Sequence, residues 1–442
     1  SKADLFYPAA YDPNESPALD FVQSTDTLFI THPNYAMRTL AYGTSDITWA
    51  FSTLNFKDGP YLPIDTSGVS MTFTGTNPTL TLTATGIFSS TDSTGGSGTA
   101  TEVNRRIRLL DSDGVWFWAQ ITSYTSDNVV VATLQETTDT PAASPITSFR
   151  LGLFHEGTTT IPGETSATWK NLPRNIALHE DRFFFSGSIS DPERVDGTIT
   201  GGYSPTQLRF DPTDPAGNVT PDLAIEAVLG GSEVNSVNWM RPLDRGLGIG
   251  TTGGEGLLMS STQGEGLTPA NGVYKQNTSN GSSFVKPFAV GAAVLYMQRA
   301  SRSLREFGYN FQADSYKSPD MSALAEHLTR GGVKEMAWQQ EPGNILWVLK
   351  TDGSLLGFTY DRDEGVIAWH KHSLGGSDVV IKSIQVIPSA DGLSDELWLI
   401  VSRTVDGNSV QYVEYMTNYY TDDVDQEDAY HVDCGRSYAG DT

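Results

Sequence analysis

Short segments with alternating apolar and polar residues dominate the chain, and turns rich in Gly, Asp, Asn, Pro and Ser separate them. Alternation with a period of two places every second side chain on the same face of a strand, so this pattern predicts β-structure. One segment differs. Residues 318–328 open with Ser-Pro-Asp and are followed by two glycines, which are typical start and stop signals of a helix. The pattern therefore predicts an all-β fold with one candidate helix.

The predicted strands repeat as a unit, in which an alternating strand, a strongly apolar strand and a third strand are joined by turns. The apolar second strands of the predicted units are residues 27–30, 182–185, 246–249, 293–296, 345–348 and 396–400. From the third unit on, these strands recur at about fifty residues, which is the scale of a propeller blade. Fourth strands are predicted at residues 47–51, 223–228 and 366–370.

We therefore expect β-propeller-like repeats of about six blades, an arrangement that leaves only short, protected strand edges. A pair of stacked β-sandwiches is the alternative. The interval between the first two units is rich in Thr, Ser and Gly and contains strand patterns of its own, so we interpret it as an inserted small β-domain. The expected division is a first blade at 1–56, the inserted domain at 57–169, the remaining blades at 170–418, and a C-terminal segment of uncertain fold at 419–442.

Composition narrows the class of protein. Apolar residues make up 38% and charged residues 18% of the 442 residues, which excludes a disordered chain. Cys434 is the single cysteine, so neither an intrachain disulfide nor a cysteine-based zinc site can form. No stretch approaches 18 consecutive apolar residues, and we predict no membrane insertion.

The charge is strongly acidic, with 28 Lys and Arg against 53 Asp and Glu and a formal net charge of −25. A protein that binds the phosphates of a nucleic acid needs clustered Lys and Arg, so specific binding of DNA is not expected. A channel through which DNA passes must not bind the DNA. Carboxylates on its wall would prevent binding, because they repel phosphates over about 8–10 Å. The simpler interpretation is that the acidity keeps the chain soluble.

Candidate chemistry is sparse. Residues 248–253 match G-x-G-x-x-G, but a strand pattern follows where a dinucleotide site needs a helix, so we expect a hairpin. His370 and His372 offer two metal-binding imidazoles without an apparent third ligand. The acidic segments 361–365 and 421–428 lack the spacing of a hand-type calcium loop and are interpreted as solvated turns. We expect no catalytic, cofactor-binding or metal-binding residues, no cofactor and no enzymatic activity.

Carbohydrate chemistry is the alternative that stays open. Carboxylates are plentiful, and their spatial separation, which decides whether a pair can hydrolyse a glycoside, cannot be read from the sequence. Tryptophans in the predicted propeller strands are interpreted as packing residues, although they would also suit a surface that binds sugars. The alternative function is therefore a propeller that binds or cleaves glycans at a host surface.

Several segments resemble the tail nozzle family of short-tailed bacteriophages, also described as tail tubular protein B or stabilisation-type proteins. The resembling segments are residues 23–35, 55–61, 190–195, 298–307, 324–328, 338–342, 352–355 and 368–372. They occur in order over roughly residues 20–416, and the strongest are Leu-Ala-Glu-His-Leu at 324–328 and the segments that follow it. The chain departs from the family at Gly256 and Asp196, where an aromatic residue is expected.

The resemblance implies a structural virion protein located in the phage tail. It implies a homohexameric ring that lies below the tail adaptor protein and forms the distal nozzle of the tail tube. Genomic double-stranded DNA would be ejected through this ring without specific binding, and a tail fibre or plug protein would attach to it. The family's role is architectural, so the resemblance carries over no catalytic residue.

Overall fold

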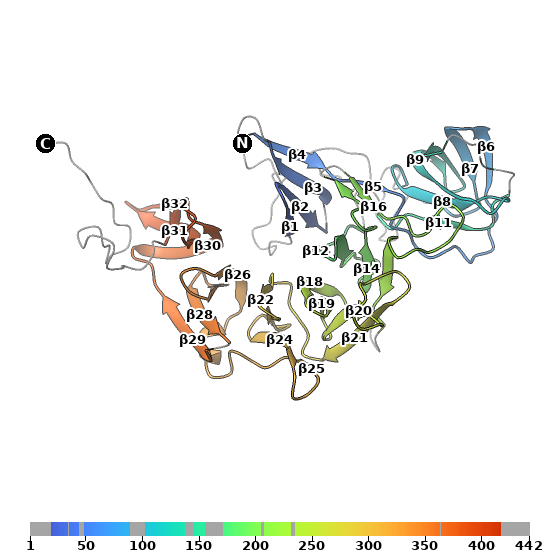
Figure 1. The fold of residues 1–442 in the computed structure, drawn as a ribbon. Coiled ribbons are helices and arrows are strands. Elements are labelled where there is room, and N and C mark those ends of the chain that lie inside the picture. Colours follow the sequence, from blue (N-terminus) through green and yellow to red (C-terminus); the bar gives the residue numbers. More distant parts are fainter. Residues whose placement is uncertain are drawn as a thin grey trace. The chain divides into compact units, whose positions relative to one another are not determined.

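The computed structural model describes residues 19–33, 35–43, 48–88, 102–137, 141, 145–154, 171–204, 207–230, 235–362 and 364–416. The chain divides into two compact units, Ser1–Ser279 and Asn280–Thr442. Both consist of small, mostly antiparallel sheets, and the strands of each sheet can be followed in Figure 1. The segment 421–428 and Cys434 lie outside the described residues.

The first unit contains three four-stranded sheets in its described part, and each is hydrogen-bonded in the order expected for a blade. The first sheet is β1 (Asp20–Ser24), β2 (Thr27–His32), β3 (Tyr35–Tyr42) and β4 (Trp49–Thr53). The second is β12 (Asn175–His179), β13 (Arg182–Ser186), β14 (Arg194–Gly197) and β17 (Ile225–Val228). The third is β18 (Val237–Leu243), β19 (Gly246–Thr251), β20 (Glu255–Ser260) and β21 (Gly272–Thr278).

A six-stranded sheet lies between the first two blades in the sequence, with the order β11-β8-β9-β10-β7-β6. Its strands are β6 (Thr72–Thr76), β7 (Thr79–Thr83), β8 (Arg106–Leu110), β9 (Trp116–Ser126), β10 (Val129–Gln135) and β11 (Phe149–Leu151). A second, three-stranded sheet joins β5 (Asn55–Lys57), β15 (Tyr203–Ser204) and β16 (Gln207–Arg209), with β16 parallel to β5. The six-stranded sheet is the inserted β-domain.

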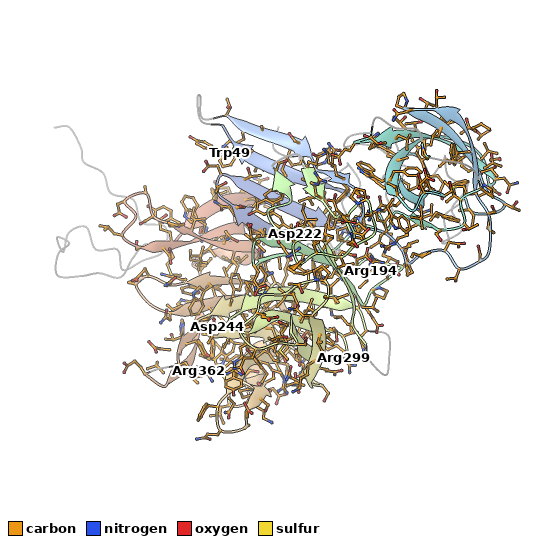
Figure 2. All side chains as sticks on the ribbon, turned by 45° about the vertical axis from the view of Figure 1, so that its right-hand side comes forward. Trp49, Arg194, Asp222, Asp244, Arg299 and Arg362 are labelled. Carbon is orange, nitrogen blue, oxygen red and sulfur yellow. The ribbon has the colours of Figure 1, made fainter. Side chains whose placement is uncertain are left out.

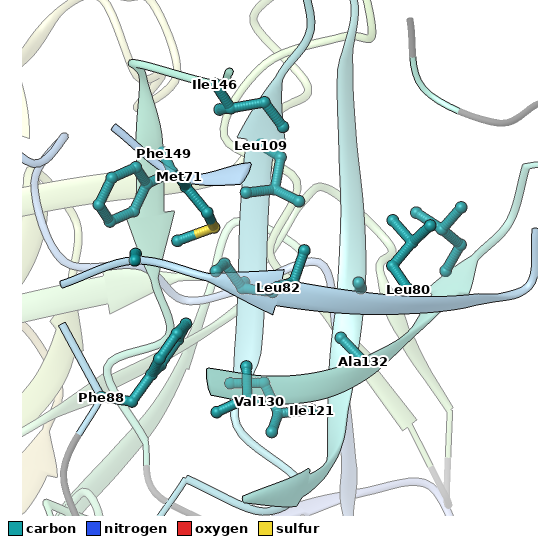
Figure 3. Close-up of a cluster of buried hydrophobic side chains, with 14 residues drawn as sticks. Met71, Leu80, Leu82, Phe88, Leu109, Ile121, Val130, Ala132, Ile146 and Phe149 are labelled. Carbon is teal, nitrogen blue, oxygen red and sulfur yellow. The ribbon is translucent and has the colours of Figure 1, made fainter. Parts of the chain in front are cut away.

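The inserted sheet has its own apolar core, shown in Figure 3. In the segment Thr79–Thr83 the two leucines alternate with threonines, and Leu80 and Leu82 are fully buried. Each buried leucine contributes about 1.5–3 kcal/mol to stability. The alternating sequence of β10 buries Val130, Ala132 and Leu134 in the same way. The inserted sheet therefore folds around apolar side chains of its own.

The second unit contains two four-stranded sheets and one three-stranded sheet in its described part. Its strands are β22 (Phe288–Val290), β23 (Ala293–Met297), β24 (Leu304–Asn310), β25 (Ser315–Lys317), β26 (Val333–Gln339), β27 (Ile345–Lys350), β28 (Leu355–Asp361), β29 (Val366–His372), β30 (Ser377–Pro388), β31 (Asp395–Val405) and β32 (Asn408–Tyr415). One apolar cluster joins β23 and β24 to β26, β27 and β28, so the first two sheets pack face to face.

In four of the blades the second strand is buried along most or all of its length. Every residue of β13, β19 and β23 is buried, and so are five of the six residues of β27. A strand covered on both faces reads as a continuous apolar run, whereas a strand with one solvated face alternates. This is why the central strands were the clearest signal in the sequence.

The candidate helix at residues 318–328 is confirmed only at its C-terminal end. Of this segment, residues 326–328 are helical, as part of α1 (Glu326–Thr329), and residues 318–325 are not. Asp320 forms a β-bridge with Arg305, and its carboxylate accepts hydrogen bonds from the backbone N–H and the hydroxyl of Ser322. These local bonds compete with helix formation in this segment, and Leu324 is left fully exposed.

The all-β fold of propeller-like repeats with an inserted small β-domain is confirmed. The fourth strands expected near residues 47–51, 223–228 and 366–370 are β4, β17 and β29. Within the described part of the chain, no helix has the length and apolar character needed to cross a membrane.

Candidate functional site

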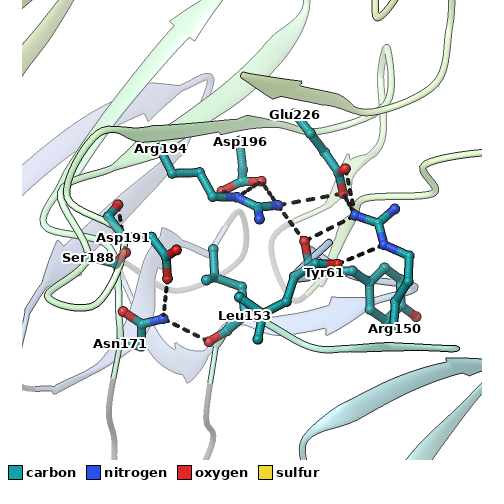
Figure 4. A network of polar contacts seen from close by, with 10 residues as sticks. Tyr61, Arg150, Leu153, Asn171, Ser188, Asp191, Arg194, Asp196 and Glu226 are labelled. Atoms are coloured by element: carbon teal, nitrogen blue, oxygen red, sulfur yellow. Dashed lines mark hydrogen bonds and ion pairs between the residues drawn. The ribbon is translucent and has the colours of Figure 1, made fainter. Parts of the chain in front are cut away.

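A buried ion pair lies on β14, where the second blade meets the inserted domain (Figure 4). Arg194 and Asp196 are two residues apart on the strand, so their side chains share one face. Arg194 Nε donates to both carboxylate oxygens of Asp196 at 2.9 and 3.0 Å, and Arg194 Nη2 donates to Oδ1 at 2.7 Å. Arg194 Nη2 also donates to the carbonyl oxygen of Tyr61 at 2.5 Å.

The inserted sheet reaches this pair through Arg150 on β11. Arg150 Nη2 donates to both carboxylate oxygens of Glu226 at 2.8 and 2.6 Å, and Glu226 lies on β17 directly opposite Asp196. Arg150 also donates to the carbonyl oxygens of Leu62 and Tyr61, at 2.8 and 3.2 Å. Two arginines from different sheets thus converge on one short backbone segment.

Two further arginines of the inserted sheet bind backbone carbonyls in the same manner. Arg106 donates through Nε and Nη2 to the carbonyl oxygen of Phe56, at 3.1 and 2.7 Å, and its guanidinium lies over the Phe56 ring. Arg108 donates to the carbonyl oxygen of Thr213 at 2.8 Å. We call Arg106, Arg108 and Arg150 the arginine anchors of the inserted sheet.

Burial shapes the pKa values at this junction. Burial raises the pKa of Asp58 to about 6, although the Arg108 guanidinium 3.7 Å away and the hydroxyl of Tyr61, which donates to Asp58, favour the charged carboxylate. Burial likewise raises the pKa of Asp196 to about 6, against the attraction of Arg194. For Arg194, burial opposes the charge, but Asp196 outweighs it and the pKa is raised. A pKa of about 6 leaves the carboxyl groups of Asp58 and Asp196 mainly in the charged form at neutral pH.

The arrangement is suited to joining sheets. The carboxylates of Asp196 and Glu226 are engaged by guanidinium groups, and the donors of the arginines are directed at carbonyl oxygens and carboxylates. Arg194 was singled out in the sequence only as part of a resembling segment, and the arginine anchors were missed. The signal that identifies the pair is Arg-x-Asp on a strand, which places both side chains on one face.

The two departures from the nozzle family have different structural explanations. At position 196 the chain has the buried carboxylate that pairs with Arg194. At position 256 a side chain has no room, since a Cβ atom would lie 2.4 Å from the carbonyl oxygen of Lys275 and 2.8 Å from the ring of Tyr274. The Tyr274 ring lies where a side chain of residue 256 would project.

The glycine-rich segment 248–253 forms a hairpin, as predicted. It covers the end of β19 and the turn into β20, and Gly250 pairs with Glu255 across the two antiparallel strands. Thr251 closes the turn, because its hydroxyl donates to the carbonyl oxygen of Gly254 at 2.9 Å. No helix begins here, so the geometry needed to bind a pyrophosphate is missing.

His370 and His372 lie on the same face of β29, with Nδ1 of His370 and Nε2 of His372 2.6 Å apart. The Trp347 ring packs edge-on against His372 at 4.8 Å between ring centroids. Burial lowers the pKa of both histidines, which favours their neutral forms. Across the described ranges, no three His, Cys, Asp or Glu side chains gather in a way that could hold a metal ion.

Two adjoining hollows, of about 740 and 580 Å³, lie at one end of the first two blades of the second unit. They share Gln340, Asn344 and Asp361, so they form one groove, which we call the turn groove. Its walls come from the turns β22–β23, β24–β25, β26–β27 and β28–β29. Arg362, labelled in Figure 2, lies just past the end of β28 and lines the larger hollow.

No family model and no curated protein matches the chain. Among solved structures, it is similar to the periplasmic gluconolactonase PpgL of Pseudomonas aeruginosa, with 12% identity, coverage of 88% of this chain and 98% of that chain, and a TM-score of 0.36. It is also similar to the β-propeller domain of Cps50 (Swd1) from Myceliophteria thermophila, with 11% identity, coverage of 69% and 85%, and a TM-score of 0.31. At these low sequence identities and TM-scores, the similarity does not identify a substrate or a partner of this chain.

The expectation that the chain is not an enzyme is corrected by this comparison. One of the similar structures is a gluconolactonase, and a gluconolactonase is an enzyme. The expectation rested on the absence of short catalytic motifs from the sequence. That absence does not exclude catalysis, because catalytic side chains can be brought together from separate turns.

Proposed function

We propose that the chain is a structural virion protein that forms the distal nozzle of a short phage tail and conducts the genome during ejection. The observation that carries this proposal is the ordered series of segments between residues 20 and 416 that resemble the nozzle family. The proposed assembly is a homohexameric ring below the tail adaptor protein, with a tail fibre or plug protein attached to it.

Residues of the resembling segments make contacts that determine blade geometry, which supports the proposal. Gln339 accepts a hydrogen bond from the indole N–H of the buried Trp347 at 2.7 Å. In the turn between β27 and β28, Asp352 accepts hydrogen bonds from the backbone N–H and the hydroxyl of Ser354 at 3.0 and 2.5 Å. Gly353 in this turn has a φ of 83°, which favours glycine.

The charge of the chain is consistent with a conduit. With a formal net charge of −25, the surface repels phosphates rather than binding them. In a ring that DNA traverses, a wall of carboxylates would limit sticking. Replacing such carboxylates by lysine would slow the passage of DNA in a salt-dependent way, because each new phosphate contact releases counterions.

The direct test is to image the purified protein with and without the tail adaptor protein by negative-stain electron microscopy. Sixfold rings that stack on the adaptor are the expected result, and sedimentation should give the mass of six chains. A protein that stays monomeric at high concentration and does not join adaptor rings would contradict the proposal. A double-stranded DNA binding assay at low salt complements the imaging, and no retention of DNA is expected.

A glycan-binding propeller at the host surface is the second candidate. The observation that favours it is the turn groove, in which aromatic and amide side chains lie together. The two candidates are compatible, since a nozzle lies at the end of the tail that meets the host.

A further inference from the structure

We infer that the turn groove is a binding site for a neutral oligosaccharide. The groove combines side chains that suit the two kinds of surface of a sugar ring, which has apolar C–H faces and a rim of hydroxyl groups. Its aromatic members are the exposed or half-buried Tyr309, Phe311 and Trp338 and the buried Tyr360, and its amide members are Asn310, Gln312, Gln340 and Asn344. Binding sites typically combine such apolar walls with a few placed polar groups.

Three of the aromatic side chains, those of Tyr309, Phe311 and Trp338, are accessible from the groove. Phe311 is 88% exposed at the turn between β24 and β25. Trp338 and Tyr309 are half-buried, because Trp338 packs against the apolar cluster between the two blades and Tyr309 packs edge-on against Tyr316. Tyr309 is also held by a hydrogen bond from its hydroxyl to Asp314. Aromatic rings fixed in this way present an apolar face at little cost in conformational entropy.

The amide side chains provide both donors and acceptors. Each Asn or Gln carries a carbonyl oxygen and an NH₂ group, so it can bind a hydroxyl group, which is itself a donor and an acceptor. Gln340 and Asn344 belong to both hollows and lie where these meet. They are therefore placed to contact a ligand that extends from one hollow into the other, as a chain of several sugars does.

A buried carboxylate holds the floor of the groove in place. Glu306 on β24 has a side chain that is only 7% exposed. It accepts a hydrogen bond from the hydroxyl of Tyr360 at 2.8 Å and lies 3.3 Å from Nη2 of Arg362. Arg362 is 46% exposed, so its guanidinium is fixed on one side and open to the groove on the other. A fixed donor of this kind loses little entropy when a ligand binds.

The charges of the groove favour a neutral ligand over an acidic one. Arg362 is the one cationic side chain in the described lining, and Glu306 already pairs with it. Asp361 and Glu341 add negative charge to the wall. An acidic sugar would meet these carboxylates and the charge of −25 that the whole chain carries. A neutral sugar avoids this repulsion.

The experiment is calorimetric titration of the full chain with neutral hexasaccharides (maltohexaose, cellohexaose, N-acetylchitohexaose and mannohexaose) and with hexagalacturonate as the acidic probe. We expect at least one neutral probe to bind and hexagalacturonate to bind at least 10-fold more weakly. Asn344→Ala and Gln340→Ala should each weaken binding by about 2- to 12-fold, the range that corresponds to one hydrogen bond. Gln411→Ala, which changes an exposed amide on β32, is the matched control and should bind like the wild type.

Trp338 provides a second comparison. Trp338→Ala should abolish detectable binding, whereas Trp338→Phe keeps an aromatic face and should retain binding within about 5-fold. Circular dichroism shows whether each variant is folded, and if Trp338→Ala is not folded, the Gln340→Ala and Asn344→Ala variants provide the test. The inference is overturned if no neutral probe binds at millimolar concentration, if the amide variants bind like the wild type, or if hexagalacturonate binds more tightly. None of these results bears on ring formation, which is measured separately.

Discussion

Arg194 and Asp196, two residues apart on β14, form a bidentate ion pair that is almost completely buried. Asp196→Ala removes the closest charged partner of Arg194 and leaves it only the carboxylate of Glu226, at 3.6 Å. Removing one partner of a buried ion pair is strongly destabilising, so we expect the free energy of unfolding to fall by about 3–5 kcal/mol. Denaturant unfolding followed by circular dichroism measures this change.

Replacing both partners by apolar residues provides the control for this prediction. The double variant Arg194→Met with Asp196→Leu removes both charges and should recover most of the lost stability, because the desolvation penalty disappears together with the attraction. A double variant that is less stable than Asp196→Ala would show that Arg194 acts mainly through the carbonyl of Tyr61 or through Glu226.

The raised pKa of Asp58 predicts a pH dependence of stability. The pKa is about 6 in the folded protein and about 4 in an unfolded chain, so between these values the folded state holds a proton that the unfolded state has lost. The contribution of Asp58 to the free energy of unfolding therefore rises as the pH falls from about 6 to 4. Its slope is at most about 1.4 kcal/mol per pH unit.

Asp58→Asn removes this titration and keeps an acceptor for the hydroxyl of Tyr61. The difference in unfolding free energy between the wild type and this variant should change between pH 6 and 4 and be flat from pH 7 to 8. An exposed carboxylate serves as the matched control, and Asp391→Asn should show no such rise towards low pH. A difference that stays constant from pH 4 to 8 would rule out the raised pKa.

Gly357 on β28 lies under the His370 ring, and a Cβ atom at this position would lie 1.9 Å from Cε1 of His370. We expect Gly357→Ala to displace the ring and to lower the free energy of unfolding by about 1–3 kcal/mol, the usual cost of overpacking. Gly343→Ala is the control, because nothing lies within 4 Å of an added Cβ there. Equal stability of the two variants would contradict this account.

The arginine anchors predict a local effect on the inserted domain. Arg106→Ala removes two hydrogen bonds to the carbonyl of Phe56 and should speed amide hydrogen exchange in β5 and β8 by about 10-fold or more, with little change in the second unit. Arg330→Ala, an exposed arginine of the second unit, is the matched control. Uniformly faster exchange throughout the chain would show that Arg106 supports global stability instead.

The sequence was informative where apolar periodicity decides the structure. The strands β13, β19, β23 and β27 were recognisable because both of their faces are covered, and the hairpin at 248–253 because a strand follows the glycines. The strand β8 was missed. Its sequence, Arg-Ile-Arg-Leu-Leu, does not look buried, yet four of its five residues are, because the arginines are directed at backbone carbonyls.

The turn groove could not be predicted from the sequence either. Its lining comes from four turns that are separated along the chain by up to about 70 residues, and none of these turns carries a recognisable motif. Trp338 was interpreted as a packing residue, and the structure shows both roles for its ring, which packs on the apolar cluster and also lines the groove. Sites built from turns depend on how strands pair, and local sequence does not record this.

The arginine anchors have a consequence for how this protein can change over time. Most of the acceptors of these hydrogen bonds are backbone carbonyl oxygens, those of Phe56, Leu62 and Thr213, and every amino acid supplies that group. The carboxylate of Glu226, which accepts from Arg150, is the exception. Substitutions at the positions that offer only a carbonyl leave these acceptors intact, whereas substitutions of the arginines do not. The attachment of the inserted domain therefore depends mainly on its own arginines. We infer that the domain could attach in the same way to blades with different side chains.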